Sequence, residues 1–550
     1  MRQHLPCAIL VVLQALASAP VFAAEEPVAS PLATIACPLP TTDKSLQPVP
    51  TATLSSGVPM YFNAPSTSPR LETLDIVRVG ISLDVYRQGQ AWAQLQKQNA
   101  SQANALHIGT ALPMDPKDYP IDGARKDIAW GQRISNATEL ALQGFPERWP
   151  IPTITVVRGY NPKAEKLRLP PDEAAKMLSR MASLELGDAG LHWHRINQLK
   201  NGVICNDTPE AVIEAVFGVF EQNPDMPALL LYVVEGYNMA RILMSTNEKP
   251  IGGGTGPRQP GELTDSVVAI VVARPERLAW LREYAKYTKA NPGSIDPAFI
   301  GWERSPKHEF RPSTFFPNPI TQRGFEQWDR LKVLARLHRP VTVSLYQEDK
   351  PSAPLKGQAR DRAIASGWDQ ASTALGSAPA RAFFDTGKPD GAIAVLAPAL
   401  HAAQHPLDPL DSSQSYDLTQ RLGDTGSASP FVGLALATMA SYLNADSSLV
   451  LPLRQADRAT FIGVSAPVPG KKPADDPFGV SLRPQHTAVT NEPSPEFQAW
   501  QGQRHIDYQR EQERSAPRYR DPAIVAMEQR ILDDFIASSP NSDPLNPKKN

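Results

Sequence analysis

The sequence predicts an α/β protein whose two halves resemble each other, each with a mixed or parallel sheet flanked by helices. Continuous apolar runs of strand length stand at 228–234 and 266–273, and again at 448–453 and 459–464, which is the pattern of buried strands. In both halves an apolar-faced helix and a short turn with Asn and Asp precede the first run. So short a match arises by chance as readily as by duplication, and the repeat is an expectation.

The composition indicates a folded chain of more than one domain. Its 550 residues exceed the usual length of a domain, and 41% apolar against 20% charged residues exclude global disorder. Its 55 prolines are about twice the usual share of roughly 5%, which predicts stiff, irregular connections. The net charge of -2 has no basic excess, so a nucleic-acid partner is not expected.

Residues 1–24 resemble a secretory signal peptide. An apolar stretch from 8 onward ends in a segment at 21–23 that fits the small-residue cleavage rule, although only one Arg precedes it. The alternative is a buried or wrongly assigned start of the chain. Pro20 interrupts the stretch, and no later run reaches the roughly 20 apolar residues of a membrane-spanning helix, so no stable span is expected.

Residues 25–70 are rich in Pro, Ser, Thr and Ala and are expected to form a leader. Cys37 and Cys205 would remain after removal of a signal peptide. They could form one disulfide in an oxidising compartment. Two unrelated thiols are an equally good interpretation, because the sequence does not show proximity.

The first α/β domain is expected to span 71–335. Thr208 and Pro209 predict a helix start just before Ala211, since Pro suits the first helical position. A polar stretch before residue 152 is expected to be irregular. The predicted elements are strands at 74–83, 152–157, 228–234 and 266–273 and helices at 88–98, 170–186, 211–221, 275–289 and 321–337.

The second α/β domain is expected to span 336–483. Ser429 and Pro430 predict a helix start by the same logic as in the first domain. The predicted elements are strands at 341–346, 381–385, 448–453 and 459–464 and helices at 356–375 and 429–443.

Residues 484–550 are expected to form a polar and amphipathic helical tail. A helix from about 522 to 536 would place Ile524, Met527, Ile531 and Phe535 on one face. A helix this short is marginal alone in water, so the face needs something to pack on. This face could pack on the rest of the chain or in a groove on another protein. In the second case these four residues are the candidate partner-binding residues.

No local motif predicts a catalytic, cofactor or metal site. The Gly-rich run 251–256 is followed by prolines and a strand, whereas a phosphate-binding loop needs a helix there. His192 and His194 could share a strand face and bind zinc, but no third ligand stands at a recognisable spacing. There is no Gly-x-Ser-x-Gly elbow, and neither Cys37 nor Cys205 stands at a strand-to-helix turn.

Polar residues directly follow the strand at 228–234, where α/β sheets place functional loops. Glu235 and Arg241 could belong to a binding site or form a structural ion pair. The ion pair is the favoured interpretation.

Short structural motifs in both parts of the chain resemble those of a known family. They are Val79-Gly80-Ile81-Ser82-Leu83-Asp84 with Trp92, residues 217–235 with Gly236-Tyr237-Asn238, Arg339-Pro340-Val341 and Phe461-Ile462-Gly463. Over roughly residues 70–480 the chain resembles the type VI secretion lipase adapter family.

This resemblance implies an adapter that binds a toxic phospholipase effector and loads it onto the spike protein of the secretion machine. The phospholipase chemistry then belongs to the cargo, and the adapter needs neither catalysis nor a cofactor. Loading implies a cytoplasmic location, whereas an export signal at 1–24 would place the protein in the periplasm. The alternative function is a thiolase-like or other α/β enzyme acting on acyl substrates, since thiolase-type folds also consist of two α/β halves.

Overall fold

The structure is a computed structural model of the chain. It describes residues 70–480 with gaps, of which the largest lie at 158–168, 199–208, 240–257 and within 275–321, and scattered positions between 503 and 533. The signal-like segment, the leader, Cys37 and Cys205 lie outside the described residues.

Strands and helices alternate through the first half, at the positions where the apolar runs predict the strands. α5 begins after Glu210, while Thr208, the predicted cap, lies outside the described residues. The elements are β1 (Thr73–Leu83), β2 (Tyr86–Arg87), α2 (Gly89–Ser101), a 3-10 turn (Ala105–His107), α3 (Gly123–Leu142), β3 (Pro150–Val156), α4 (Pro171–Asp188), β4 (Arg195–Gln198), α5 (Ala211–Gln222), β5 (Ala228–Glu235) and β6 (Ser266–Ala273).

The second half repeats the alternation after a connecting region with β7 (Thr288–Lys289), β8 (His308–Glu309) and α8 (Gln322–Asp329). Its elements are β9 (Ala335–His338), β10 (Val341–Ser344), α9 (Gly357–Leu375), β11 (Arg381–Asp385), α10 (Ala392–Ala402), β12 (Ser415–Asp417), α11 (Leu418–Leu422), a 3-10 turn (Gly426–Ala428), α12 (Ser429–Asn444), β13 (Ser447–Pro452) and β14 (Arg458–Ser465).

One mixed sheet runs through both halves in the order β12-β11-β13-β14-β9-β1-β6-β5-β3-β4, with β2 beside β1 and β10 beside β14. In the first half β3 pairs in parallel with β4 and β5, and β6 pairs antiparallel with β5 and β1. In the second half β11 pairs in parallel with β12 and β13, and β14 pairs antiparallel with β13 and β9. Both halves thus share one strand order and one set of directions, and the α/β class is confirmed.

The two halves join where β1 pairs antiparallel with β9. β9 begins at Ala335, so the predicted boundary between 335 and 336 falls inside this strand. The sheet is therefore continuous across both predicted domains, and their division stays a prediction.

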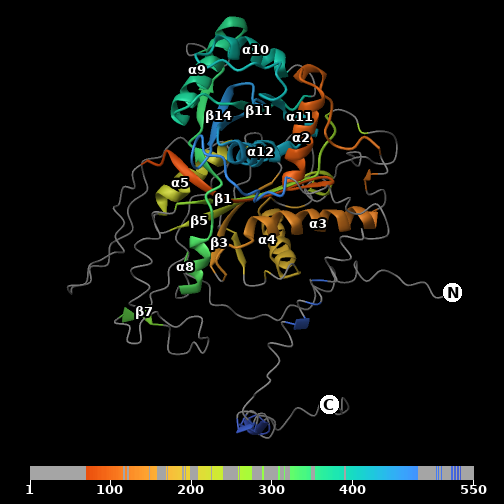
Figure 1. Ribbon diagram of the computed structural model, residues 1–550, viewed down its shortest axis with the longest axis vertical. Coiled ribbons are helices and arrows are strands. Elements are labelled where there is room, and N and C mark those ends of the chain that lie inside the picture. The colour runs from red at the N-terminus through yellow and green to blue at the C-terminus, as the bar shows by residue number, and fades with distance from the viewer. Residues whose placement is uncertain are drawn as a thin grey trace, which may run out of the picture.

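Helices lie on both sides of the strands and between them (Figure 1). α9 and α10 cover the strands of the second half, and α3 and α4 cover those of the first. α12 lies between the two sets and packs on β13 and β14 as well as on β1 and β6. Its side chains are buried from Ser429 to Tyr442, because strands and helices surround it on all sides.

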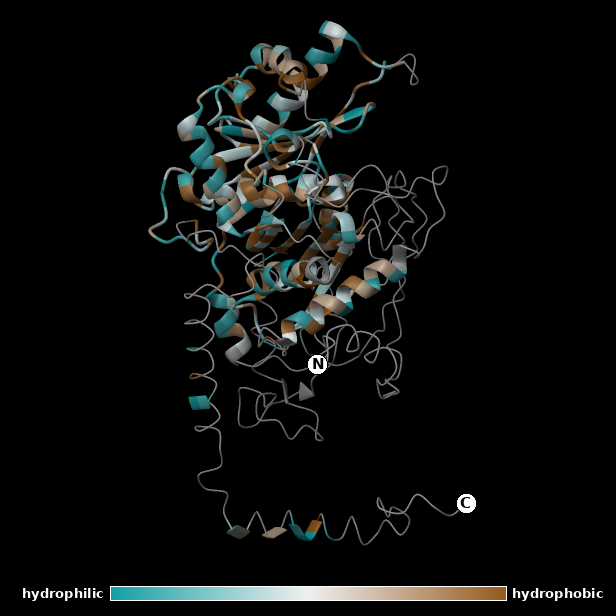
Figure 2. Ribbon diagram, turned by 90° about the vertical axis from the view of Figure 1, so that its right-hand side faces the viewer, coloured by the Kyte–Doolittle hydropathy of each residue, from teal (hydrophilic) through white to brown (hydrophobic). Residues whose placement is uncertain are grey.

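The apolar core follows this layering. Figure 2 shows hydrophobic residues gathered in the strands and the central helix. The larger cluster joins the strands of the first half to α12, and a smaller one fills the space beneath α9 and α10 around Trp368 and Phe461. Among the described residues no helix combines the length and apolarity that crossing a bilayer requires.

Two helix predictions are wrong in part. The region 321–337 is not one helix: α8 ends at Asp329, and β9 follows as a strand. Residues 335–338 form a strand because they pair with neighbours on both sides. Leu334 N–H donates to the carbonyl of Ile76, and β9 pairs with both β1 and β14. In the predicted helix 275–289 the described residues Thr288–Lys289 form a short strand, paired with β8.

Two helices have no counterpart in the prediction. α3 lies in the stretch that its polar composition marked as irregular, yet its apolar side packs on β1 and β6. α10 contains Pro398, which normally argues against a helix interior. Packing against α9 and the sheet outweighs these local preferences.

Candidate functional site at the seam between the halves

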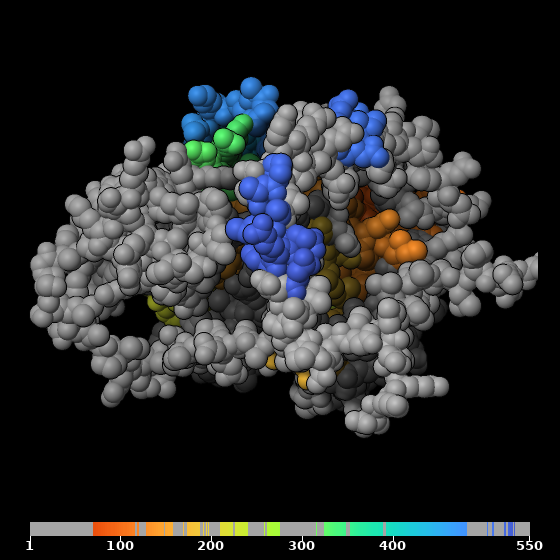
Figure 3. Space-filling model, turned by 90° about the horizontal axis from the view of Figure 1, so that it is seen from below, coloured from red at the N-terminus to blue at the C-terminus, as the bar shows by residue number. Residues whose placement is uncertain are grey.

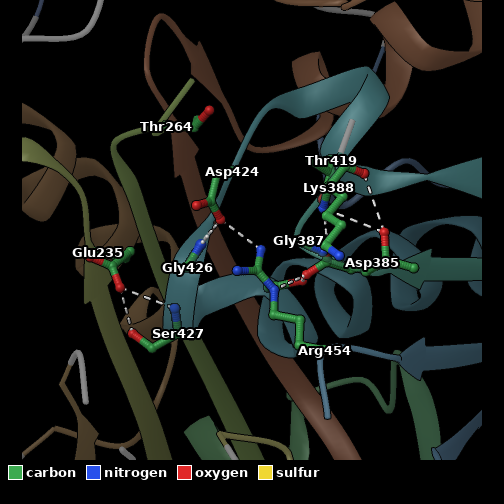
Figure 4. A network of polar contacts seen from close by, with 12 residues as sticks. Glu235, Thr264, Asp385, Gly387, Lys388, Thr419, Asp424, Gly426, Ser427 and Arg454 are labelled. Atoms are coloured by element: carbon green, nitrogen blue, oxygen red, sulfur yellow. Dashed lines mark hydrogen bonds and ion pairs between the residues drawn. The ribbon is translucent and has the colours of Figure 1, made fainter. Parts of the chain in front are cut away.

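Charged and hydroxyl side chains collect where strands of the two halves end near each other (Figure 4). β11 ends at Asp385 and β5 ends at Glu235, and the carboxyl ends of strands are where α/β sheets place functional groups. We call the connected set the seam; it consists of Asp84, Glu235, Arg258, Thr264, Asp385, Asp424, Ser427 and Arg454.

Asp385 is a fully engaged hydrogen-bond acceptor. Its carboxylate accepts bonds from the hydroxyls of Thr419 and Ser429, from Gly387 N–H at 2.8 Å and from Arg454 Nε at 2.5 Å. Burial alone would raise the pKa of Asp385, but the Arg454 guanidinium and these bonds hold it below its usual value. The group is therefore a buried, ionised anchor.

Arg454 connects Asp385 to a second carboxylate. Its Nη2 lies 2.7 Å from Asp424 Oδ1, and Asp424 also accepts the N–H of Gly426 at 2.9 Å. The two carboxylates raise the pKa of Arg454 against the effect of its burial. Arg454 thus ties the end of β11 to the loop between α11 and α12.

Glu235 reaches from the first half into the second. Its Oε2 accepts the N–H of Ser427 at 3.0 Å and the hydroxyl of the same residue at 2.9 Å. A Cβ on Gly426 would lie 2.4 Å from this oxygen, so the close approach requires glycine. Glu235 therefore holds the loop before α12 against the end of β5.

Arg258 completes the seam on the side of β1. This guanidinium is 1% exposed and donates to Asp84 Oδ2 at 2.8 Å and to the hydroxyl of Thr264. Thr264 in turn donates to the carbonyl of Leu422 at 2.5 Å, and its N–H donates to the carbonyl of Asp424 at 2.7 Å. Side-chain and backbone bonds thus join the entry of β6 to the second half.

The polar groups of the seam are bonded to one another and to the main chain. Each of its ion pairs lies within one half, Asp84 with Arg258 in the first and Arg454 with Asp385 and Asp424 in the second. The bonds of Glu235 to Ser427 and of Thr264 to the carbonyls of Leu422 and Asp424 join the two halves. Ser429 stands at a helix start, where α/β enzymes place a nucleophile, but it is buried and bonded to Asp385. Among the described residues no group of three or more His, Cys, Asp or Glu side chains could hold a metal ion.

A buried carboxylate beside the seam predicts a pH dependence of stability. Asp417 caps α11, with its Oδ1 3.0 Å from Gln420 N, and burial raises the pKa of Asp417 to about 7. An Asp side chain in the unfolded chain has a pKa of about 3.9. The protonated Asp417 carboxyl therefore stabilises the fold at low pH, and this stabilisation is lost as pH rises through about 7. Glu210, also buried, has its pKa raised to about 7 by the same cause. We expect Tm to fall between about pH 4 and pH 7, the window between the unfolded and folded pKa values.

The variant Asp417→Asn tests this prediction, because Asn keeps the capping oxygen and cannot ionise. The decline of Tm with pH should become shallower in Asp417→Asn, while Glu210 maintains part of it. Thermal unfolding across the pH range measures both slopes, and equal slopes would contradict the assignment.

The structure describes half of the candidate partner-binding residues. Met527 and Ile531 are 58% and 59% exposed, and every described residue between 522 and 533 is helical. Figure 3 shows described residues of this segment, in blue, at the surface. Ile524 and Phe535 lie outside the described residues.

Other residues singled out in the sequence have structural contacts. His194 Nε2 lies 2.9 Å from the carbonyl oxygen of Phe145, so its ring is engaged with the backbone; His192 lies outside the described residues. Arg241 and the Gly-rich run 251–256 also lie outside them. Sequence reasoning missed Asp385 and Arg454, although a carboxylate directly ending a predicted strand is a signal that could have indicated Asp385.

Several solved structures are similar to the chain over most of its length. A structure of a type II PKS acyl-carrier protein in complex with its ketosynthase matches with 11% identity and a TM-score of 0.38, covering 72% of this chain and 100% of that one. The ketosynthase from module 6 of the bacillaene synthase from Bacillus subtilis 168 matches with 10% identity and a TM-score of 0.37, covering 72% and 73%. OleA from Xanthomonas campestris matches with 12% identity and a TM-score of 0.33, covering 72% and 98%. No activity of this chain follows from similarity at this level.

Two family models match the sequence itself. The N-terminal model of the type VI lipase adapter protein Tla3 matches residues 72–252, and the C-terminal model matches residues 334–466. Together they cover more than half of the chain, and they include β1, β5 and β14 and the turn from β9 into β10, where the motifs described above lie. The chain therefore belongs to the family of type VI lipase adapter proteins named Tla3.

Proposed function

We propose that this protein binds a type VI secretion phospholipase effector and helps to load it onto the spike protein, without catalysis of its own. The observation that carries the proposal is the match to the lipase adapter family in both halves. The seam is compatible with it, because its carboxylates and guanidinium groups are bonded to one another and to main-chain groups.

An adapter that hands cargo to a second protein needs two binding surfaces. The C-terminal helix offers one that is separate from the body's core. Met527 and Ile531 are spaced by four residues and more than half exposed, as in helices that dock an apolar face in a groove. We assign the partner contact to this face, with Ile524 and Phe535 extending it.

Co-precipitation of the full chain with a lipase effector and a spike protein encoded beside its gene tests the adapter function. We expect the effector to be retained by the folded protein and the spike protein to be recovered with it.

The same protein should be recovered from the cytoplasmic fraction with Met1 intact if it loads its cargo before secretion. A chain that starts near Ala24 would place it in the periplasm instead. Folded protein that retains neither partner would contradict the proposal.

The face of the C-terminal helix gives a sharper prediction. Ile531→Glu removes an apolar anchor worth about 1.5–3 kcal/mol when buried, which corresponds to about a tenfold or greater weakening of Kd. Tm should stay unchanged, because Ile531 is exposed in the free protein. Gln529→Glu is the matched control, since it adds the same charge on the opposite side of the helix and should leave Kd unchanged. A fall in Tm with unaltered Kd would instead show that the helix docks on the body.

The enzyme alternative makes a different prediction. An α/β enzyme acting on acyl substrates should turn over acyl thioesters or esters in the absence of any partner. Turnover that is lost in Cys205→Ala would favour that function over the adapter.

A further inference from the structure

A second polar cluster lies where the β1–β2 hairpin meets α3, apart from the contacts that join the halves. α3 runs antiparallel to β1 here, since Arg78 near the start of β1 donates to the carbonyl of Gln143 just past the end of α3. We call it the hairpin cluster; it consists of Ser82, Arg87, Arg133, Asn136 and Asp265.

The backbone geometry turns Ser82 and Arg133 toward each other. A Cβ on Gly80 would lie 1.8 Å from the carbonyl oxygen of Ala137, so this face of β1 lies directly against α3. Ser82 is two residues further along the strand and therefore on the same face. Arg133 precedes Ala137 by four residues and therefore lies on the same side of α3, one helical turn nearer to Ser82.

The side chains at this contact lack acceptors. Ser82 Oγ and Arg133 Nε are buried, at 0% and 5% exposure for the two residues, and neither has a hydrogen-bond partner among the described residues. Arg87 lies directly opposite Ser82 in the hairpin register. Buried polar groups in folded proteins are nearly always paired, so two unpaired groups on facing elements indicate a missing partner.

The charges at the contact are also unbalanced. Arg133 pairs with Asp265 at 2.5 Å, and Asp84 is already paired with Arg258. Within the described residues Arg87 has no carboxylate partner. Its guanidinium donates to Asn136 Oδ1 at 3.0 Å and to main-chain carbonyls. Burial, with a further contribution from the nearby charge of Arg133, lowers the pKa of Arg87 to about 9.

We propose that Ser82, Arg87 and Arg133 form a binding site for a small inorganic anion. One anion would accept bonds from the Ser82 hydroxyl, the Arg133 Nε–H and the Arg87 guanidinium. It would also neutralise the excess positive charge. Guanidinium groups bind oxyanions through charge-assisted hydrogen bonds, and phosphate and chloride share the required negative charge and acceptor capacity.

The bound anion would tie the hairpin to α3 and so hold Asp84, the turn residue that also anchors the seam. Asp84 adopts a left-handed backbone with φ 45, which is unfavourable for a residue other than glycine, so the turn depends on its neighbours. A ligand that binds only the folded state raises stability with its concentration. The body of the adapter would therefore be stabilised by the anion.

Thermal unfolding of the full chain tests the site. Sodium phosphate is titrated against sodium isethionate, a bulky filler salt, at constant ionic strength, and sodium chloride is titrated in a parallel series. We expect Tm to rise by several degrees with anion concentration. A rise with phosphate alone identifies an oxyanion site, and a rise with both salts identifies a general site for small anions. Unchanged Tm in both series would overturn the proposal.

Two variants separate binding from general stability. In Arg87→Met the dependence of Tm on anion concentration should be lost. Arg381→Met is the matched control, because Arg381 is equally buried but paired through two bonds to Asp446, so Tm should fall while the anion dependence stays. In titration calorimetry with phosphate, the heat of binding should likewise be lost in Arg87→Met. Full anion dependence in Arg87→Met would contradict the assignment.

Discussion

Replacing Arg258 with Met is expected to lower the free energy of unfolding by about 3–5 kcal/mol. The guanidinium is 1% exposed, and its loss leaves the Asp84 carboxylate as a buried charge without its partner. Tyr119 and Thr264 lose a donor at the same time. Because Thr264 also bonds the second half, the loss should loosen the joint between the halves. Urea unfolding of wild type and variant measures the difference.

The double variant Arg258→Met with Asp84→Asn is the control for this effect. It removes the buried charge that the single variant leaves unpaired, so it should recover part of the stability. A single variant within about 1 kcal/mol of wild type would show that the pair is unimportant for the fold.

Gly80→Ala is expected to cost about 3 kcal/mol or more. A Cβ at this position would lie 1.8 Å from the carbonyl oxygen of Ala137, and both contacting groups are backbone. Neither β1 nor α3 can yield locally, because β1 pairs with β6 and β9 and α3 packs across the sheet. The added methyl must therefore push α3 away from the sheet. Thermal and urea unfolding report the loss.

Gly218→Ala is the matched control. Gly218 lies in α5, and a Cβ there would meet no atom within 4 Å. Ala stabilises a helix interior by about 0.5–1 kcal/mol relative to Gly, so this variant should be as stable as wild type or more so. A Gly80→Ala protein that matches Gly218→Ala in stability would refute the close packing of α3 on β1.

Part of the fold could be predicted because its signal is local. The runs at 228–234 and 266–273 are apolar except for Ser266, and the structure buries every residue of β5 and β6. The strand at 381–385 and the helix start at Ser429 were predicted for the same kind of reason: an apolar run in one case, a Pro in the first turn in the other. α3 was not, since polar and apolar residues are interspersed along it and its packing on β1 is a tertiary contact.

The candidate sites could not be predicted from short stretches of sequence, because the residues that contact one another lie far apart in the chain. Glu235 was noticed for its position after a strand, yet Ser427, which it binds, stands 192 residues away. The pair Asp84 and Arg258 is separated by 174 residues. Ser82 and Arg133 lie on facing sides of β1 and α3 only because the chain brings this strand and this helix together, and neither segment alone indicates an anion site.

The sequence by itself determined the apolar strands β1, β5, β6, β13 and β14, the helices α5 and α12 that precede two of them, and the resemblance to the adapter family. Periodicity, caps and motifs act over a few residues, so one segment is enough to show them. The tertiary structure alone decided that 335–338 is a strand, that the halves share one sheet, and that buried charges join at the seam. These depend on the free energy of bringing distant segments together, since pairing and burial exist only once the chain has folded.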